Sequence, residues 1–577
     1  MDHAYDLVIR GGQVVDGSGE PGFETDVAVK NGVIAAVGKI GGQGREEIDA
    51  RGFIVTPGFV DVHTHYDGQA TWDTHMQPSS WHGVTTVVMG NCGVGFAPCH
   101  AGDHDTLIKL MEGVEDIPFP VLSQGLKWNW TSYPDYLDAL AERRFDIDIG
   151  SQLPHAALRV HVMGQRGADR EPATAVDIAA MAAIAKRSVE AGALGFSTSR
   201  TLNHRTSDGQ PTPTLTAGED ELTGIALGLK AAGRGVLQVV SDFADPEAEF
   251  AMLRRIVEAS GRPLSFSLLQ SPIHPQAYKA LLAALDDAVA AGLEMKAQVA
   301  PRPVGLLLGF ELTLNPFSHH ATYRELSKAP LAERFARLSQ PEVRAQLLAE
   351  RPDSPVRGLI ANWDRMHLMD PGRPDYEPTE DGTVGARARA LGISPESVAL
   401  DHMLSNGGRG MIYVPFLNYA EGSLDPAYAM LTHAHTVPGL SDGGAHVGMI
   451  CDGSFPTSLL THWTRDRTRG PKLKLETAVR MQTADTAAIV GLFDRGRIAP
   501  GLRADLNVID YDRLTLRSPQ VAYDLPAGGR RLIQRAEGYV ATIVAGAVTY
   551  RDGEPTGALP GRLLRGARSA PVAVAAE

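Results

Sequence analysis

The sequence Gly52-Phe-Ile-Val-Thr-Pro-Gly-Phe-Val-Asp-Val-His-Thr-His-Tyr-Asp67 begins as a run of apolar and β-branched residues. This run predicts a buried β-strand over residues 53–63, which ends in His63 and His65. Because side chains alternate along a strand, the two imidazoles share a face and can bind one metal ion together. A bare His-x-His is more often part of a surface turn, but the apolar strand before this pair favours a metal site.

The size and composition are those of an enzyme larger than one domain. An α/β barrel takes about 250 residues, so a chain of 577 residues predicts a barrel with at least one accessory domain. A net charge of −14 argues against a nucleic-acid partner. The three cysteines, Cys92, Cys99 and Cys451, are too few for a disulfide framework. With no signal peptide pattern and no long apolar run, we expect a cytoplasmic protein that does not span a membrane.

Helix and strand patterns alternate through the middle of the chain, which is typical of a parallel sheet with crossover helices. Four helices are predicted at 175–191, 219–232, 246–260 and 276–291. Eight strands are predicted at 53–63, 85–90, 145–153, 193–198, 235–241, 264–270, 294–300 and 437–442. Eight strands with helices between them predict a (β/α)8 barrel of the TIM type.

Both ends of the chain have a different, strand-and-turn pattern. Within residues 5–50, Asn31-Gly32 separates two apolar runs and predicts a hairpin with a type I′ turn. The same strand-and-turn pattern recurs at 494–510 and 539–550. We therefore expect small β elements at both ends of the barrel sequence.

Further candidate site residues follow other predicted strands. Cys92 follows the second strand, and Asp442 ends the eighth. In a barrel the C-terminal ends of the strands form the active-site face. Two histidines and a carboxylate leave a coordination position for water, whose pKa the metal lowers. Asp442 would be both ligand and base, taking a proton from that water and passing it to a leaving nitrogen; alone, Ser441-Asp442-Gly443-Gly444 also fits an ordinary turn.

Three stretches resemble one family. Pro57-Gly-Phe-Val-Asp-Val-His-Thr-His65 is similar to the first barrel strand of the amidohydrolase superfamily. Gly90-Asn-Cys-Gly-Val-Gly95 and Gly192-Ala-Leu-Gly-Phe-Ser-Thr198 resemble its N-acyl-D-amino-acid deacylase (D-aminoacylase) branch. The resemblance implies a metal-dependent hydrolase of the amide bond in N-acyl-D-amino acids, with Cys92 as a metal ligand beside His63, His65 and Asp442.

The resemblance also implies a division of the chain. Residues 1–52 and 491–577 would form a split β-sandwich, and residues 53–490 the hydrolase barrel. About 135 residues separate the seventh and eighth predicted strands, so we expect an insertion at about 303–436, either a lid subdomain or a packing helix hairpin.

The sequence departs from the branch at strands five and six, where the family carries metal-binding histidines. No histidine occurs between His204 and His274, and Gln238, Asp242, Gln270 and His274 would be weak substitutes. We therefore expect one zinc ion, since the Cys92 thiolate favours zinc, and a second metal site is doubtful. Two alternatives stay open: a hydrolase of another linear or cyclic amide, and a binding protein that has lost full catalytic ligation.

Substrate recognition is predicted from charge. A substrate carboxylate favours an arginine, and Arg205 and Arg302 lie just past predicted strands four and seven, with His204 beside Arg205. A surface charge is the alternative for each arginine and a structural cap for the histidine. The expected partner is a small-molecule amide substrate, with no nucleic acid and no membrane, and the sequence allows a homo-oligomer.

Overall fold

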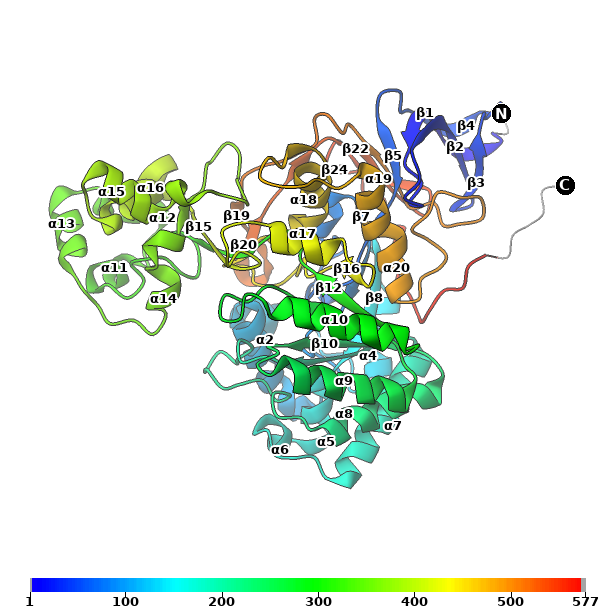
Figure 1. Ribbon diagram of the computed structural model, residues 1–577, viewed down its shortest axis with the longest axis horizontal. Helices are drawn as coiled ribbons and strands as arrows, with labels where there is room; N and C mark the ends of the chain where they lie inside the picture. Colours follow the sequence, from blue (N-terminus) through cyan, green and yellow to red (C-terminus); the bar gives the residue numbers. More distant parts are fainter. Residues whose placement is uncertain (1–2, 572–577) are drawn as a thin grey trace.

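Eight parallel strands form the centre of the computed structural model, which describes residues 3–571 (Figure 1). They are β6 (Phe59–Asp61), β7 (Val84–Met89), β8 (Asp148–Pro154), β9 (Gly195–Arg200), β10 (Val236–Ser241), β11 (Leu264–Leu268), β12 (Met295–Val299) and β16 (Thr436–Pro438). Each strand pairs with the next one along the chain. All eight predicted barrel strands are present, although the first is divided and the eighth ends at Pro438, four residues before Asp442.

The first and eighth strands meet just beyond their C-terminal ends. Thr64 and Gly443 form a parallel β-bridge. The N–H of Asp442 donates to the carbonyl of His63 at 3.1 Å, and the N–H of His65 donates to the carbonyl of Gly443 at 2.8 Å. The sheet therefore curls until its edges touch at the face where the candidate site residues lie.

The single strand predicted over 53–63 is wrong, because two short strands share this stretch. β5 (Ile54–Pro57) pairs with strands of the terminal sheet, whereas β6 pairs with β7 in the barrel. Gly58 lies between them, where an added Cβ would be 2.2 Å from the Thr85 hydroxyl oxygen. Both strands are buried, so their apolar composition gave no sign of the break. His63 and His65 follow β6 rather than lying inside a strand.

Crossover helices cover the outside of the sheet, in the lower part of Figure 1. The four predicted helices are confirmed to within one residue as α7 (Ala175–Ala191), α8 (Glu219–Ala232), α9 (Pro246–Ser260) and α10 (Ala277–Ala290). Thr174 and Asp177 form a capping box at the start of α7, and Asp245 caps α9 ahead of Pro246. The capping residues thus account for where α7 and α9 begin.

The two ends of the chain share one nine-stranded sheet, seen at the upper right of Figure 1 beside the N-terminus. Besides β5, its strands are β1 (Tyr5–Val14), β2 (Phe23–Lys30), β3 (Val33–Gly38), β4 (Gly44–Asp49), β17 (Leu506–Ile509), β22 (Tyr539–Val544), β23 (Ala547–Arg551) and β24 (Glu554–Pro555). Asn31 and Gly32 both have positive φ, 53° and 77°, which confirms the hairpin between β2 and β3. β17 pairs directly with β5, so the sheet joins the N- and C-terminal segments.

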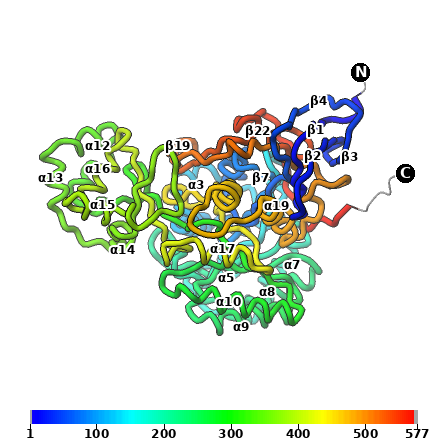
Figure 2. The backbone as a smooth tube through the Cα atoms, turned by 45° about the horizontal axis from the view of Figure 1, so that its top comes forward, coloured from blue at the N-terminus to red at the C-terminus, as the bar shows by residue number. Residues whose placement is uncertain are grey.

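A helical lobe lies between β12 and β16. Its sheet contains β13 (Val304–Leu308), β15 (Ile412–Leu417) and β14 (His367–Leu368). Its longest helices are α12 (Leu331–Leu338), α13 (Pro341–Ala349), α15 (Val384–Leu391) and α16 (Pro395–Gly408). The lobe has its own apolar core, and both Figure 1 and Figure 2 show it extending away from the barrel on the side opposite the N-terminal sheet.

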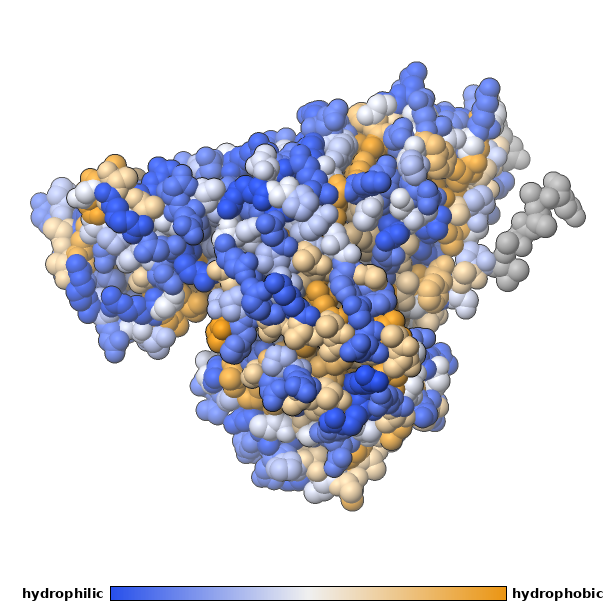
Figure 3. Space-filling view, viewed as in Figure 1, coloured by the Kyte–Doolittle hydropathy of each residue, from blue (hydrophilic) through white to orange (hydrophobic). Residues whose placement is uncertain are grey.

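The surface face in Figure 3 is largely hydrophilic, with apolar patches between the charged residues. Among residues 3–571, no helix combines the length and apolar character needed to cross a membrane.

A buried ion cluster joins the barrel to the terminal sheet. Nη1 of Arg495 lies 2.8 Å from the carboxylate of Asp148 at the start of β8 and 3.4 Å from Asp505, which precedes β17. All three side chains are almost fully buried. Removing one member of such a cluster leaves uncompensated charge in the interior.

We predict that Arg495→Met lowers the free energy of unfolding by about 3 kcal/mol, the lower end of the loss for a broken buried ion pair, because Asp148 and Asp505 lose their fully buried counterion and keep only the partly exposed Arg503. Arg497→Met is the matched control, since Arg497 pairs with Asp16 near the surface and such pairs contribute about 0–1 kcal/mol. Denaturant unfolding of both variants measures the difference. Equal losses would show that the cluster does not hold the two units together.

Candidate metal centre

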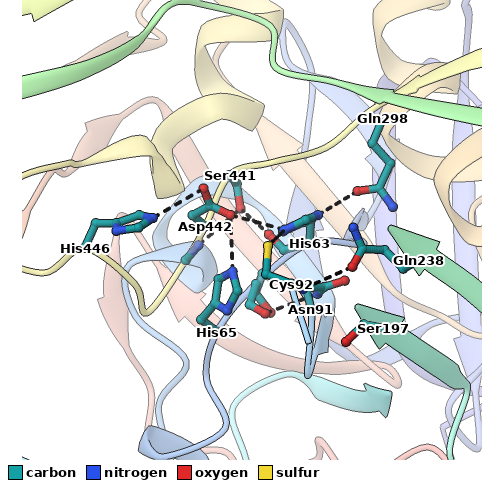
Figure 4. Close-up of polar contacts among 12 residues, drawn as sticks. His63, His65, Asn91, Cys92, Ser197, Gln238, Gln298, Ser441, Asp442 and His446 are labelled. Carbon is teal, nitrogen blue, oxygen red and sulfur yellow. Dashed lines mark hydrogen bonds and ion pairs between the residues drawn. The ribbon is translucent and has the colours of Figure 1, made fainter. Parts of the chain in front are cut away.

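Four side chains from three strand ends converge at the C-terminal face of the barrel (Figure 4). Oδ1 of Asp442 lies 3.5 Å from Nε2 of His63 and 3.4 Å from Nε2 of His65. Nε2 of His63 is also 3.2 Å from Sγ of Cys92. His63, His65 and Cys92 thus form one group of candidate ligands, and the Asp442 carboxylate lies beside its two imidazoles.

The spacing of these atoms fits a zinc ion. Ligand atoms around tetrahedral zinc, with bonds of about 2.0–2.3 Å, stand about 3.3–3.8 Å apart. The two carboxylate–imidazole contacts of 3.4 and 3.5 Å fall within this range, and the His63–Cys92 contact of 3.2 Å lies just below it. Ligand atoms of His63, His65 and Cys92 lie within 4.8 Å of one another. Oδ1 of Asp442 and Nε2 of His65 are buried and have no hydrogen-bond partner among the described residues. Such atoms need a partner, and a cation would supply it.

The surroundings shift the pKa values of three of these groups in different ways. Burial lowers the pKa of His63 to about 4, so its ring is neutral near pH 7 and keeps a lone pair. Burial alone would raise the pKa of Asp442, but the neighbouring imidazoles, His65 foremost, hold it well below its usual range. Burial raises the pKa of the Cys92 thiol to about 11. Without a cation the thiol therefore stays protonated, and a metal would have to displace its proton.

The backbone is strained at this centre. Cys92, Asp442 and His446 have φ values of 54°, 49° and 48°, a region that residues with a side chain adopt at a cost. Three such residues within one cluster indicate that the fold stabilises their positions at the expense of backbone energy. Strain of this kind collects at functional sites.

Two residues of the centre were missed by the sequence analysis. Glu115 ends α2 (His104–Glu115), with Oε1 3.2 Å from Nδ1 of His65. Its Oε2 lies 3.6 Å from Nε2 of His446, which is 4.0 Å from Oδ2 of Asp442. Glu115 comes from a helix rather than a strand end, so barrel topology did not point to it. His446 follows Asp442 by four residues, and that proximity was the available signal.

Two glutamines from inside the barrel also reach the centre. Gln238 of β10 accepts the N–H of Cys92 at 3.0 Å, and Oε1 of Gln298 of β12 lies 2.8 Å from Nδ1 of His63. Of the weak substitutes considered for strands five and six, only Gln238 contacts the cluster. Asp242 binds the backbone of Leu202, and Gln270 accepts the N–H of Ala420.

The residues predicted to bind substrate are dispersed. His204 lies near the centre with Nδ1 2.8 Å from the Ser199 hydroxyl, and burial lowers its pKa to about 3. Arg205 is directed to the carbonyl of Gly209 at 3.1 Å. Arg302 is buried, with Nη2 2.9 Å from Asp452. Because Asp452 already pairs with Arg302, the structure favours a structural role for this arginine.

Comparison with known proteins decides the family. The model of the "Amidohydrolase family" matches residues 46–550. The chain belongs to the amidohydrolase family. It is 27% identical to N-acyl-D-glutamate deacylase of Alcaligenes xylosoxydans xylosoxydans over 586 residues, covering 100% of this chain and 99% of that protein.

Solved structures of this amidohydrolase branch match the whole fold. A D-aminoacylase studied for its binuclear metal centre has a TM-score of 0.65 and 26% identity, covering 97% of this chain and 100% of that one. N-acyl-D-glutamate deacylase from Bordetella bronchiseptica, complexed with zinc and a phosphonate inhibitor, has a TM-score of 0.64 and 24% identity over 97% of this chain and 99% of that one. The chain is thus a metal-dependent amidohydrolase with the expected barrel.

We predict that Gly90→Ala destabilises this amidohydrolase by about 1–3 kcal/mol more than Gly209→Ala. Both glycines have positive φ, but an added Cβ at Gly90 would lie 2.2 Å from the Gln152 carbonyl, whereas the space at Gly209 is open. Overpacking should therefore displace the loop that carries Cys92. Unfolding midpoints of the two variants measure the effect, and equal midpoints would contradict it.

Proposed function

We propose that this enzyme hydrolyses the amide bond of N-acyl-D-amino acids at one zinc ion held by His63, His65 and Asp442, with Cys92 as a further ligand. The observation that carries the proposal is the convergence of two Nε2 atoms, one carboxylate oxygen and one thiol at the ends of three barrel strands. The thiolate and imidazoles favour zinc over magnesium or manganese. Residues 53–490 would form the catalytic unit, with residues 1–52 and 491–577 as its β domain.

The donor set also accounts for the chemistry. Bound zinc would supply a Lewis acid that polarises the amide carbonyl and lowers the pKa of water. Asp442 is ionised near pH 7, since its pKa lies well below its usual range. Its Oδ2 is directed toward His446 rather than toward the two Nε2 atoms. This oxygen can accept a proton from the attacking water and return it to the leaving nitrogen.

The substrate class is supported by the relatives. N-acyl-D-glutamate deacylase and N-acyl-D-aspartate deacylase of Alcaligenes xylosoxydans xylosoxydans match 95% or more of both chains. Similarity at this level is better evidence for the type of bond that is cleaved than for the substrate side chain that is accepted, because pocket residues vary on a shared fold. We therefore propose the class and not one amino acid.

A panel of N-acetyl amino acids of both hands, with released amino acid resolved by chiral chromatography, tests the proposal. We expect hydrolysis of the D substrates in excess over the L substrates. Activity confined to cyclic amides such as hydantoins would overturn the substrate class. Zinc-loaded protein that hydrolyses neither group would favour a binding protein.

We predict that Asp442→Asn lowers kcat by about 10²- to 10⁴-fold, the usual contribution of a general base, with little change in KM. The amide keeps the shape of the carboxylate but cannot accept the proton from water. Steady-state kinetics on protein whose zinc content equals that of the wild type separates the lost base from lost metal. Near-normal kcat with full zinc would show that another residue is the base.

We predict one tightly held zinc per chain and none in His63→Ala. His75→Ala is the control, because His75 is a partly exposed histidine beside Asp73. Mass spectrometry for metals on protein purified without chelator gives the stoichiometry. Two tightly bound ions would require a second ligand set, and full zinc in His63→Ala would remove His63 from the first.

A further inference from the structure

We propose that Glu115 and Gln298 are positioning residues. Glu115 keeps a proton on Nδ1 of His65, and Gln298 keeps a proton on Nδ1 of His63. The Nε2 lone pairs of both rings then face Asp442 and Cys92. The inference rests on the proposed zinc site and names two residues beyond its ligand set. An imidazole binds a metal through an unprotonated nitrogen, so the tautomer decides which nitrogen is available. Two rings must therefore be set in the same tautomer for both to bind one ion.

Gln298 sets the ring of His63. Its Oε1 lies 2.8 Å from Nδ1, while its amide nitrogen donates to the Ser265 hydroxyl at 3.0 Å. With the amide nitrogen directed to Ser265, the oxygen is left to accept a hydrogen bond from the ring N–H. Gln298 is almost fully buried within β12, so water does not compete for this contact. Nε2 of His63 then keeps its lone pair toward Cys92 and Asp442.

Glu115 sets the ring of His65. Its Oε1 lies 3.2 Å from Nδ1, an ion-pair distance, although the two atoms are not aligned for a hydrogen bond. A carboxylate oxygen attracts a ring N–H and repels a ring lone pair, so this contact favours a proton on Nδ1. Glu115 is 1% exposed, and its backbone carbonyl accepts the N–H of Val447 at 3.3 Å. The helix end is thus attached to the loop that carries Asp442 and His446.

The neighbouring residue fixes this helix end. Oδ2 of Asp116 accepts the N–H of Gly448 at 3.0 Å and the hydroxyl of Thr313 at 2.7 Å. Asp116 therefore connects α2 both to the loop after the eighth strand and to the helical lobe. The carboxylate of Glu115 is presented to His65 from a rigid position, which a positioning role requires.

Hydrogen-bond partners of metal-binding histidines normally increase metal affinity, and their removal lowers this affinity about 10–100-fold. We expect Glu115→Leu and Gln298→Leu each to weaken zinc binding by this factor. Glu115→Gln and Gln298→Glu keep an acceptor oxygen and should stay within a few-fold of the wild type. Glu112→Leu on the same helix is the matched control, because Glu112 accepts only the N–H of Phe119 in the described structure.

Zinc affinity, measured by competition with a chromogenic chelator, is combined with nitrogen-15 NMR of histidine-labelled protein. We expect Nδ1 of both rings to carry a proton with and without zinc, and Gln298→Leu to alter the His63 pattern alone. An unprotonated Nδ1 in the wild type would overturn the proposal, as would leucine variants with unchanged thermal midpoints and wild-type zinc affinity. If a leucine variant does not fold, the wild-type spectrum still decides.

The two proposals fail in different ways. Protein that binds zinc with the expected ring pattern but hydrolyses no N-acyl-D-amino acid would refute the substrate class and keep the positioning role. Protein that hydrolyses these substrates but has an unprotonated Nδ1 on either ring would keep the function and refute the positioning role.

Discussion

The meeting of the first and eighth barrel strands is the interaction on which the metal centre depends. The backbone bonds from Asp442 to His63 and from His65 to Gly443 place an acidic side chain directly beside two imidazoles. Asp61 reinforces the junction, since it accepts the Ser441 hydroxyl and the N–H of His63. Backbone pairing thus sets the relative positions of candidate ligands that are about 380 residues apart.

Burying these groups together lowers the stability of the protein. Buried carboxylates and imidazoles lose solvation, and the effective penalty is several kcal/mol for each ion that lacks a partner. Asp61 illustrates the cost, because burial raises its pKa to about 7. The unpartnered oxygens of Asp442 and Glu115 lie in the same cluster as the residues with positive φ. Unpaired charge and backbone strain at one place favour a functional explanation over a structural one.

The sequence predicted those parts of the molecule that local chemistry controls. Helices α7 to α10 followed from the alternation of helix and strand patterns. His63, His65 and Asp442 became candidates through their places after strands, and Cys92 became a candidate ligand through the family resemblance. The break at Gly58 could not be predicted, because β5 and β6 are both buried and apolar. Gln298 lies 235 residues from His63. The available signal in the sequence was that Gln298 is a polar residue within a strand expected to be buried. The sequence contains no comparable signal for Glu115, because glutamates at the ends of helices are common.

Strand five shows how this chain differs from the branch it resembles. In β10, Gln238 uses its amide oxygen to hold the N–H of Cys92, a residue with positive φ. An amide is a weaker zinc ligand than an imidazole, but it is a good acceptor for a backbone N–H. The same strand position thus orients the cysteine loop in this protein. Within the proposed single-zinc site, Gln238 therefore acts as a support for the Cys92 loop and not as a ligand.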